Sequence, residues 1–116
     1  MRRDPRVYLL DALTAGDLIG AFLAGRSLDD YEADAMLRSA VERQFEIIGE
    51  ALRQLTDLAP EIAASIPACR RVVAFRNQLA HGYFAIRHDV VWAIATTDLL
   101  PILEELRVLL QRYEPE

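Results

Sequence analysis

The sequence predicts an all-α fold, an antiparallel bundle of four or five helices. Apolar residues recur at intervals of three and four along most of the chain, and no segment gives a convincing strand pattern. Short connections that carry Gly or Pro separate the long apolar segments, as is typical of antiparallel helices. Because 116 residues are the length of one domain, we expect residues 1–116 to form a single helical domain.

The first two predicted helices supply most of the apolar residues. The first runs from about Asp4 to Leu23, and Pro5 suits its first turn. One side of it carries Val7, Leu10, Leu13, Leu18 and Phe22. The second and longest helix runs from about Asp30 to Thr56, after Ser27 and Asp30, which are spaced like a capping box. Its predicted core-facing stripe consists of Leu37, Val41, Phe45, Ile48, Leu52 and Leu55.

The second half of the chain predicts a short connection and two further helices. Pro60 and Pro67 bracket the connection, which has room for one helical turn. The third helix covers about Ala68 to Leu79, and Gly82 is a plausible left-handed terminator just past its end. The fourth begins near residues 87–89, and Pro101 should kink or divide it because its ring removes one backbone hydrogen bond.

Composition excludes some classes of protein. The net charge of −5 argues against a general nucleic-acid coat protein, although an enzyme with a local basic cleft remains compatible. The apolar fraction of 53% favours an oligomer that covers the surplus. Cys69 is the only cysteine, so neither disulfides nor a cysteine metal cluster are expected. No apolar run is long enough to span a bilayer and no signal-peptide pattern is seen, so we expect a cytoplasmic protein without membrane contact.

The segment RNQLAHGY carries the residues best suited to chemistry on RNA. When a ribose 2′-hydroxyl attacks the neighbouring phosphorus, it must lose a proton and the leaving 5′-oxygen must gain one. His81 can serve either step near neutral pH, and the guanidinium of Arg76 can hold two phosphoryl oxygens at once. Asn77 and Tyr83 could position the phosphate or orient the imidazole. This chemistry needs neither a metal ion nor a cofactor.

The spacing of Arg76 and His81 has a geometric consequence. Five positions on a continuous helix place two residues about 140° apart around the axis, so they converge only if the helix ends between them. One chain also offers only one convincing histidine for two proton transfers. A two-fold dimer would bring two copies of this helix end to one cleft and gather Arg70, Arg71 and Arg87 into a positive groove.

The second predicted helix carries ERQFEIIGEALRQL, and RNQLAHGY follows it along the chain, with SIP before it and VVWAI after it. In this order the two motifs resemble the HepT-like branch of the HEPN superfamily. The resemblance extends from DAL in the first helix to LPILEEL in the last. Two departures stand out: Ala68 and Cys69 follow Pro67 where many relatives have tryptophan, and Arg87 stands where an acidic residue often opens the last helix. Asp89 could take over that favourable place.

The resemblance implies a function as well as a fold. It implies a helical bundle that dimerises and cuts RNA as the toxin of a toxin–antitoxin pair, with a minimal nucleotidyltransferase as its partner. The family's Arg–His motif falls on Arg76 and His81, with Asn77 beside the arginine. The family's tyrosine falls on Tyr83, to which the antitoxin can transfer AMP to silence the toxin. A bulky anionic nucleotide there would repel the RNA backbone.

Four other residues admit two interpretations each. Glu50 is either a helix-face carboxylate paired with Arg53 or a partner that orients Arg76 or His81. We expect His88 to be exposed with a structural role rather than an accessory RNA contact, and Trp92 to be in the core or an interface rather than a base-stacking platform. Gly49 in mid-helix suggests a close helix crossing. Glu46, Glu50, His81 and Asp89 match no known metal-binding spacing, so no metal site is expected.

Three functions remain open from the sequence. The first is an endoribonuclease that uses Arg76 and His81. The second is a non-catalytic helical binding partner of a nucleotidyltransferase. The third is a nucleotide-binding four-helix domain without an RNA target.

Overall fold

The computed structural model describes residues 4–81 and 87–113, and within these ranges the chain is helical almost throughout, with no strand. This confirms the predicted all-α class. The elements in chain order are α1 (Pro5–Leu23), α2 (Leu28–Ala33), α3 (Ala35–Leu58), α4 (Pro60–Ala63), α5 (Cys69–His81), α6 (His88–Ala93), the π-helical stretch η2 (Ile94–Asp98) and α7 (Leu99–Arg112). None of the described helices is both long and apolar enough to cross a membrane.

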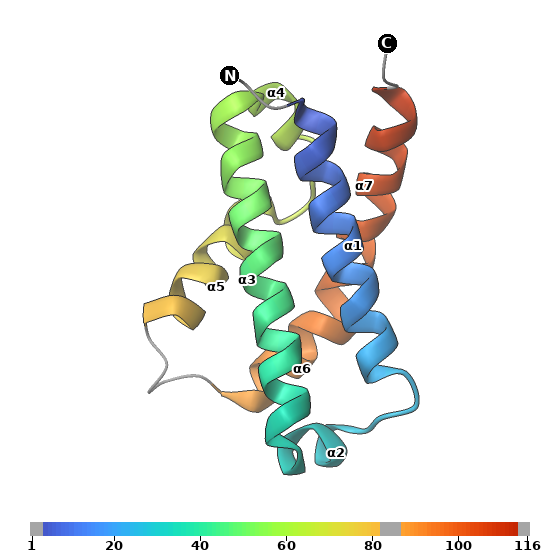
Figure 1. The fold of residues 1–116 in the computed structure, drawn as a ribbon, viewed down its shortest axis with the longest axis vertical. Coiled ribbons are helices and arrows are strands. Elements are labelled where there is room, and N and C mark those ends of the chain that lie inside the picture. The colour runs from blue at the N-terminus through green and yellow to red at the C-terminus, as the bar shows by residue number, and fades with distance from the viewer. Residues whose placement is uncertain (1–3, 82–86, 114–116) are drawn as a thin grey trace.

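The long helices α1, α3 and α7 form the body of the bundle. α1 packs between α3 and α7 and runs antiparallel to both (Figure 1). α5 packs mainly against α3, and it diverges from the bundle axis toward the side (Figure 1). The buried apolar side chains of all these elements form one core. α5 is therefore held mainly by its contacts with α3.

The first helix has the predicted bounds but a different buried face. Asp4 caps it by accepting a hydrogen bond from the Arg6 amide at 2.9 Å. The buried residues are Tyr8, Leu9, Ala12, Ala15, Gly16, Ile19 and Leu23, whereas Leu10 and Leu18 of the predicted side are exposed. Leu13 and Phe22 of that side are partly buried against the core. α1 is apolar over much of its circumference, so the spacing of its leucines does not single out the buried face.

The second predicted helix is two helices in the structure. The capping box of Ser27 and Asp30 is present, but it begins the short α2. The chain then leaves the helical conformation at Asp34, whose carboxylate accepts a hydrogen bond from the Leu37 amide at 3.0 Å and so caps α3. The break lets α2 turn so that Tyr31 packs on α6. All six residues of the predicted core-facing stripe of α3 are buried, which confirms the stripe.

The last predicted helix begins at His88, inside the predicted interval, and is divided as expected. The π-helical stretch η2 lies just before Pro101, and the Leu99 amide donates to the Ile94 carbonyl five residues back. Pro101 has no amide hydrogen to donate to Thr97, and its ring would crowd the Thr97 carbonyl in a regular helix. α4 supplies the single helical turn expected between the two bracketing prolines.

Candidate active site on α3 and α5

Arg76 lies where α5 crosses α3 at close range. Gly49 of α3 is the point of contact, because a Cβ added there would overlap the Cβ and Cγ atoms of Arg76. The Val72 carbonyl oxygen lies 3.4 Å from the same position. A larger residue at 49 would therefore push α5 away from α3. This confirms the close helix crossing predicted at Gly49. The space left by the missing Cβ is occupied by the side chain of Arg76.

Glu50 holds the guanidinium of Arg76. Its Oε2 atom lies 3.2 Å from Nη2 of Arg76, and the arginine side chain is only 28% exposed. Nη1 of Arg76 donates to Oδ1 of Asn77 at 3.2 Å. Glu50 also accepts hydrogen bonds from Arg53 at 2.7 and 3.2 Å. Both interpretations of Glu50 are thus present together, since the carboxylate pairs with Arg53 along α3 and contacts Arg76 across the crossing.

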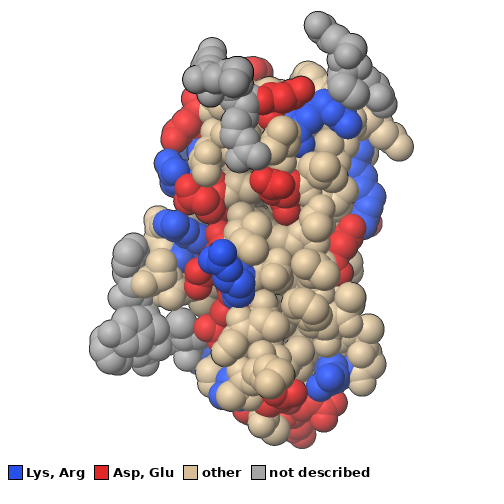
Figure 2. Space-filling model, in the orientation of Figure 1, with Lys and Arg blue, Asp and Glu red and all other residues tan. Residues whose placement is uncertain are grey.

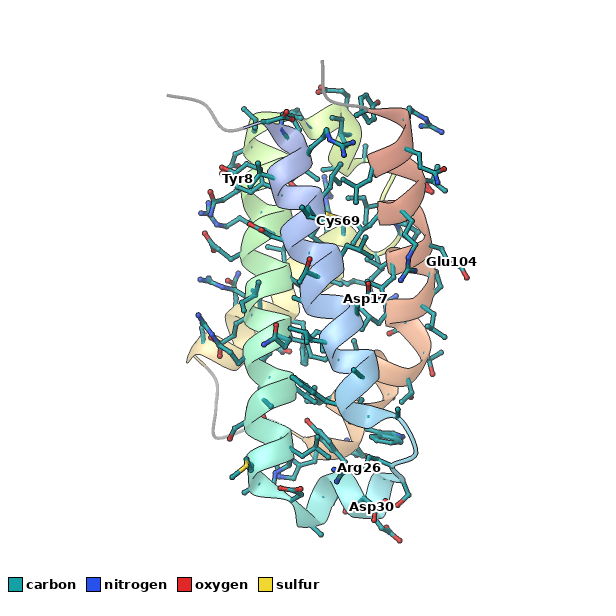
Figure 3. All side chains as sticks on the ribbon, turned by 45° about the vertical axis from the view of Figure 1, so that its right-hand side comes forward. Tyr8, Asp17, Arg26, Asp30, Cys69 and Glu104 are labelled. Atoms are coloured by element: carbon teal, nitrogen blue, oxygen red, sulfur yellow. The ribbon has the colours of Figure 1, made fainter. Side chains whose placement is uncertain are left out.

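An open hollow of about 220 Å³ lies beside Arg76. We call it the Arg76 hollow; it is lined by Tyr8, Asp11, Arg43, Glu46, Ile47, Glu50, Ala51, Gln54 and Arg76. Tyr8 lies on the side of α1 that faces α3 (Figure 3). On the α3 side of the face shown in Figure 2, basic and acidic side chains alternate, whereas the middle of that face is largely uncharged. The hollow therefore mixes cations with carboxylates rather than forming a purely basic cleft.

His81 is the last residue of α5, which extends two residues beyond the predicted end. Residues 69–81 contain neither Gly nor Pro, so no strong helix breaker precedes Gly82 and the helix continues through the histidine. The helix thus does not end between Arg76 and His81, which was the condition for their convergence within one chain. Their backbone positions are about 140° apart around the axis. The predictions for Gly82 and Tyr83 fall on residues 82–86, outside the described part of the chain.

A family model described as ribonuclease HepT-like matches residues 12–109, a range that includes Glu50, Arg76 and His81. The chain belongs to the HepT-like family. "Putative RNase MJ1380" of Methanocaldococcus jannaschii is 31% identical to this HepT-like chain over 107 residues, which are 92% of the chain and 97% of the relative. "Probable ribonuclease HepT" of Thermococcus cleftensis is 31% identical over 99 residues, 85% of the chain and 89% of the relative. No solved structure gives a match.

The other arginines predicted as RNA contacts lie away from the Arg76 hollow of this HepT-like chain. Arg70 is exposed in the first turn of α5 and has no ion-pair partner among residues 4–81 and 87–113. Together with Arg71 it lines a separate hollow. Arg71 pairs with Asp98 at 3.3 Å, and Arg87 pairs with Asp89 at 2.7 Å. One chain therefore does not gather these three cations around Arg76.

α6 departs from the prediction at one residue and follows it at two. His88 was expected to be exposed, but it is half-buried, and its Nδ1 atom is buried without a hydrogen-bond partner in the described structure. The histidine is drawn inward because its ring packs edge-on against buried Tyr31, with centroids 6.5 Å apart. Trp92 also packs on Tyr31, at 5.8 Å, which confirms its role in the core. Asp89 occupies the first turn, as predicted.

The described residues provide neither a reactive thiol nor a metal site. Burial raises the pKa of the Cys69 thiol, so at neutral pH this cysteine is a poor nucleophile. Among the side chains that the structure describes, which do not include that of His81, no three His, Cys, Asp or Glu lie together in a way that could hold a metal ion. Sequence reasoning missed that Arg43 and Asp11 line the same hollow as Arg76. Arg43 lies three residues before Glu46, a spacing typical of a solvated ion pair on one helix. From the sequence, that pair alone accounted for Arg43, so its place in the Arg76 hollow was not expected.

Proposed function

We propose that this HepT-like protein is a cytoplasmic, metal-independent endoribonuclease that acts as a toxin. Membership of a ribonuclease family supports the activity. The observation that carries the proposal is that Arg76 is held by Glu50 at the edge of an open hollow, on the helix that ends at His81. A cation that is fixed in place and partly exposed is what an RNA phosphate requires for tight contact.

The proposed reaction is an intramolecular transesterification of RNA. The ribose 2′-oxygen gives up its proton and forms a bond to the adjacent phosphorus, while the bond from phosphorus to the 5′-oxygen breaks and that oxygen takes up a proton. The products are a cyclic phosphate and a free 5′-hydroxyl. His81 acts as general base or acid, and Arg76 stabilises the charge that builds on the phosphoryl oxygens. Asn77 and Tyr83 position the phosphate.

The active unit we propose is a two-fold dimer. Because α5 is a continuous helix through His81, one chain holds the two catalytic residues at different angles around its axis. A second chain that meets the first across a shared cleft supplies another Arg76 and another His81, and thus both proton-transfer groups. Arg70, Arg71 and Arg87 would add positive charge to the rim of this cleft.

A nucleotidyltransferase antitoxin is the proposed partner. The tyrosine oxygen of Tyr83 would attack the α-phosphate of ATP, lose its proton and release pyrophosphate. The AMP left on it would be a bulky anion two residues from His81, where it repels the RNA backbone and blocks access.

Expression of the chain in cells with and without the cognate nucleotidyltransferase tests this function. The chain alone should arrest growth and His81→Ala should not, while circular dichroism shows that the variant is folded. Co-expression should relieve the arrest, and intact mass should show one added AMP that is absent in Tyr83→Phe. Arrest that persists in His81→Ala would favour the non-catalytic binding partner instead.

A further inference from the structure

Two consecutive residues of α3, Gly49 and Glu50, both contact the side chain of Arg76 in α5. Gly49 leaves the space that the Cβ and Cγ atoms of Arg76 occupy. Glu50 reaches the other end of that side chain, with 3.2 Å between its Oε2 atom and Nη2. A glycine in mid-helix destabilises the helix relative to alanine, so its presence needs a local reason. The two contacts are independent of each other, and both fix the position of Arg76.

The contacts of Arg76 leave part of its guanidinium free. An arginine carries five N–H donors in one plane. Nη1 donates a hydrogen bond to Asn77, and the Glu50 carboxylate forms an ion pair with Nη2 at 3.2 Å. Each terminal nitrogen keeps at least one N–H group, which is enough for a forked contact with two phosphoryl oxygens. The ion pair and the hydrogen bond together restrict the orientation of the guanidinium plane before any RNA arrives.

Glu50 is itself fully engaged as an acceptor. Arg53 donates from Nε and Nη2, Gln54 donates at 3.1 Å, and Arg76 approaches from α5. The hydrogen bonds from Arg53 are the main cause of a lowered pKa at Glu50, with Gln54 and Arg76 acting in the same direction. The group therefore stays a carboxylate at neutral pH and is unsuited to proton transfer. Its chemistry is that of a fixed anionic acceptor.

We propose that Glu50 is a positioning residue of the ribonuclease site, whose carboxylate fixes the plane of the Arg76 guanidinium so that its free N–H groups face the RNA phosphate. This proposal rests on the proposed function. A role limited to the ion pair with Arg53 would not explain why Gly49 opens the neighbouring position to Arg76. An exposed pair three residues apart also stabilises a helix only slightly.

Glu50→Gln compared with Asp57→Asn tests the proposal. Both variants remove one carboxylate that contacts Arg53, but only Glu50 also contacts Arg76. In cleavage of a short RNA, we expect Glu50→Gln to lower kcat about 10- to 100-fold with KM within about twofold, because a misplaced guanidinium loses transition-state contacts. Asp57→Asn should match the wild type. Equal losses in both variants would overturn the proposal.

A double variant separates positioning from a general effect on the helix. If Glu50 acts through Arg76, then adding Glu50→Gln to Arg76→Gln should change kcat by less than about twofold. A further loss as large as that of the single Glu50→Gln variant would contradict the proposal.

A measurement independent of activity distinguishes this proposal from the function on which it rests. The Nη signals of Arg76 in nitrogen-15 NMR, assigned by their loss in Arg76→Gln, report how freely the guanidinium rotates. They should be resolved in the wild type and in Asp57→Asn and averaged in Glu50→Gln. Unchanged signals in Glu50→Gln would overturn the positioning proposal, whereas a wild-type protein that cleaves no RNA would overturn the proposed function.

Discussion

At the scale of residues, the site depends on how closely Gly49 lets Arg76 approach α3. A methyl group at residue 49 would overlap the Cβ and Cγ atoms of Arg76, both of which are tied to the backbone of α5. The conflict cannot be relieved by a rotation at the far end of a flexible side chain. Either α5 shifts or Arg76 turns away from Glu50.

Gly49→Ala should therefore destabilise the protein by about 1–3 kcal/mol, as overpacking usually does, and should remove most RNA cleavage. Gly20→Ala is the matched control, since an added Cβ there meets nothing within 4 Å. Gly20 lies in α1 of the same bundle, and its replacement by alanine should raise the free energy of unfolding by about 0.4–1 kcal/mol without loss of cleavage. Urea unfolding and cleavage of a short RNA measure both effects. Similar behaviour of the two variants would show that the crossing is not sterically tight.

The sequence predicts part of this residue-level arrangement. Gly49 was expected at a close crossing because a glycine in a strong helical pattern is locally unfavourable, and Glu50 was expected to contact either Arg53 or the catalytic residues. Arg43 was missed because its contact with the hollow joins α1, α3 and α5, and periodicity along one helix carries no information about that. The burial of His88 depends on α2, whose separate existence the sequence did not predict.

At the scale of elements, Asp34 shows why boundaries are harder to predict than helices. The residues on both sides of it favour helix, so the pattern predicts one continuous segment. The structure breaks there because Asp34 satisfies the Leu37 amide and the redirected α2 buries Tyr31 against α6. Packing between distant segments outweighs local propensity at this position.

The continuity of α5 through His81 makes a prediction about subunits. If one active site needs the histidines of both chains, a dimer of one His81→Ala chain and one wild-type chain should be inactive. After the two are unfolded and refolded together at one part wild type to nine parts variant, activity should fall to roughly 1% of the wild type, because only pairs of two wild-type chains are active. A value near 10% would mean that each chain acts alone, which would contradict the shared cleft. The same mixture with Asp57→Asn chains serves as the control.

At the scale of the whole molecule, charge does not reveal the function. The chain has a net charge of −5, and the Arg76 hollow contains three carboxylates beside its two arginines. An RNA-binding surface is therefore not visible as a basic patch on the face in Figure 2. The all-α fold, the order of the long helices and the core of α3 were predictable because they follow from apolar periodicity. The divergent course of α5 was not, because a glycine in α3 predicts a close crossing but not the angle at which another helix crosses it.

The proposed function requires that this protein cleaves RNA at the 2′-hydroxyl through His81 and without a metal ion. The most direct test incubates the purified protein in EDTA with an RNA oligonucleotide, and with the same oligonucleotide carrying a 2′-deoxy sugar at the cleavage site, beside His81→Ala. We predict discrete cleavage of the all-ribose RNA by the wild type alone, with a cyclic phosphate on the new end. Cleavage that persists in His81→Ala, that continues at the deoxy position, or that appears only after metal is added would contradict the account.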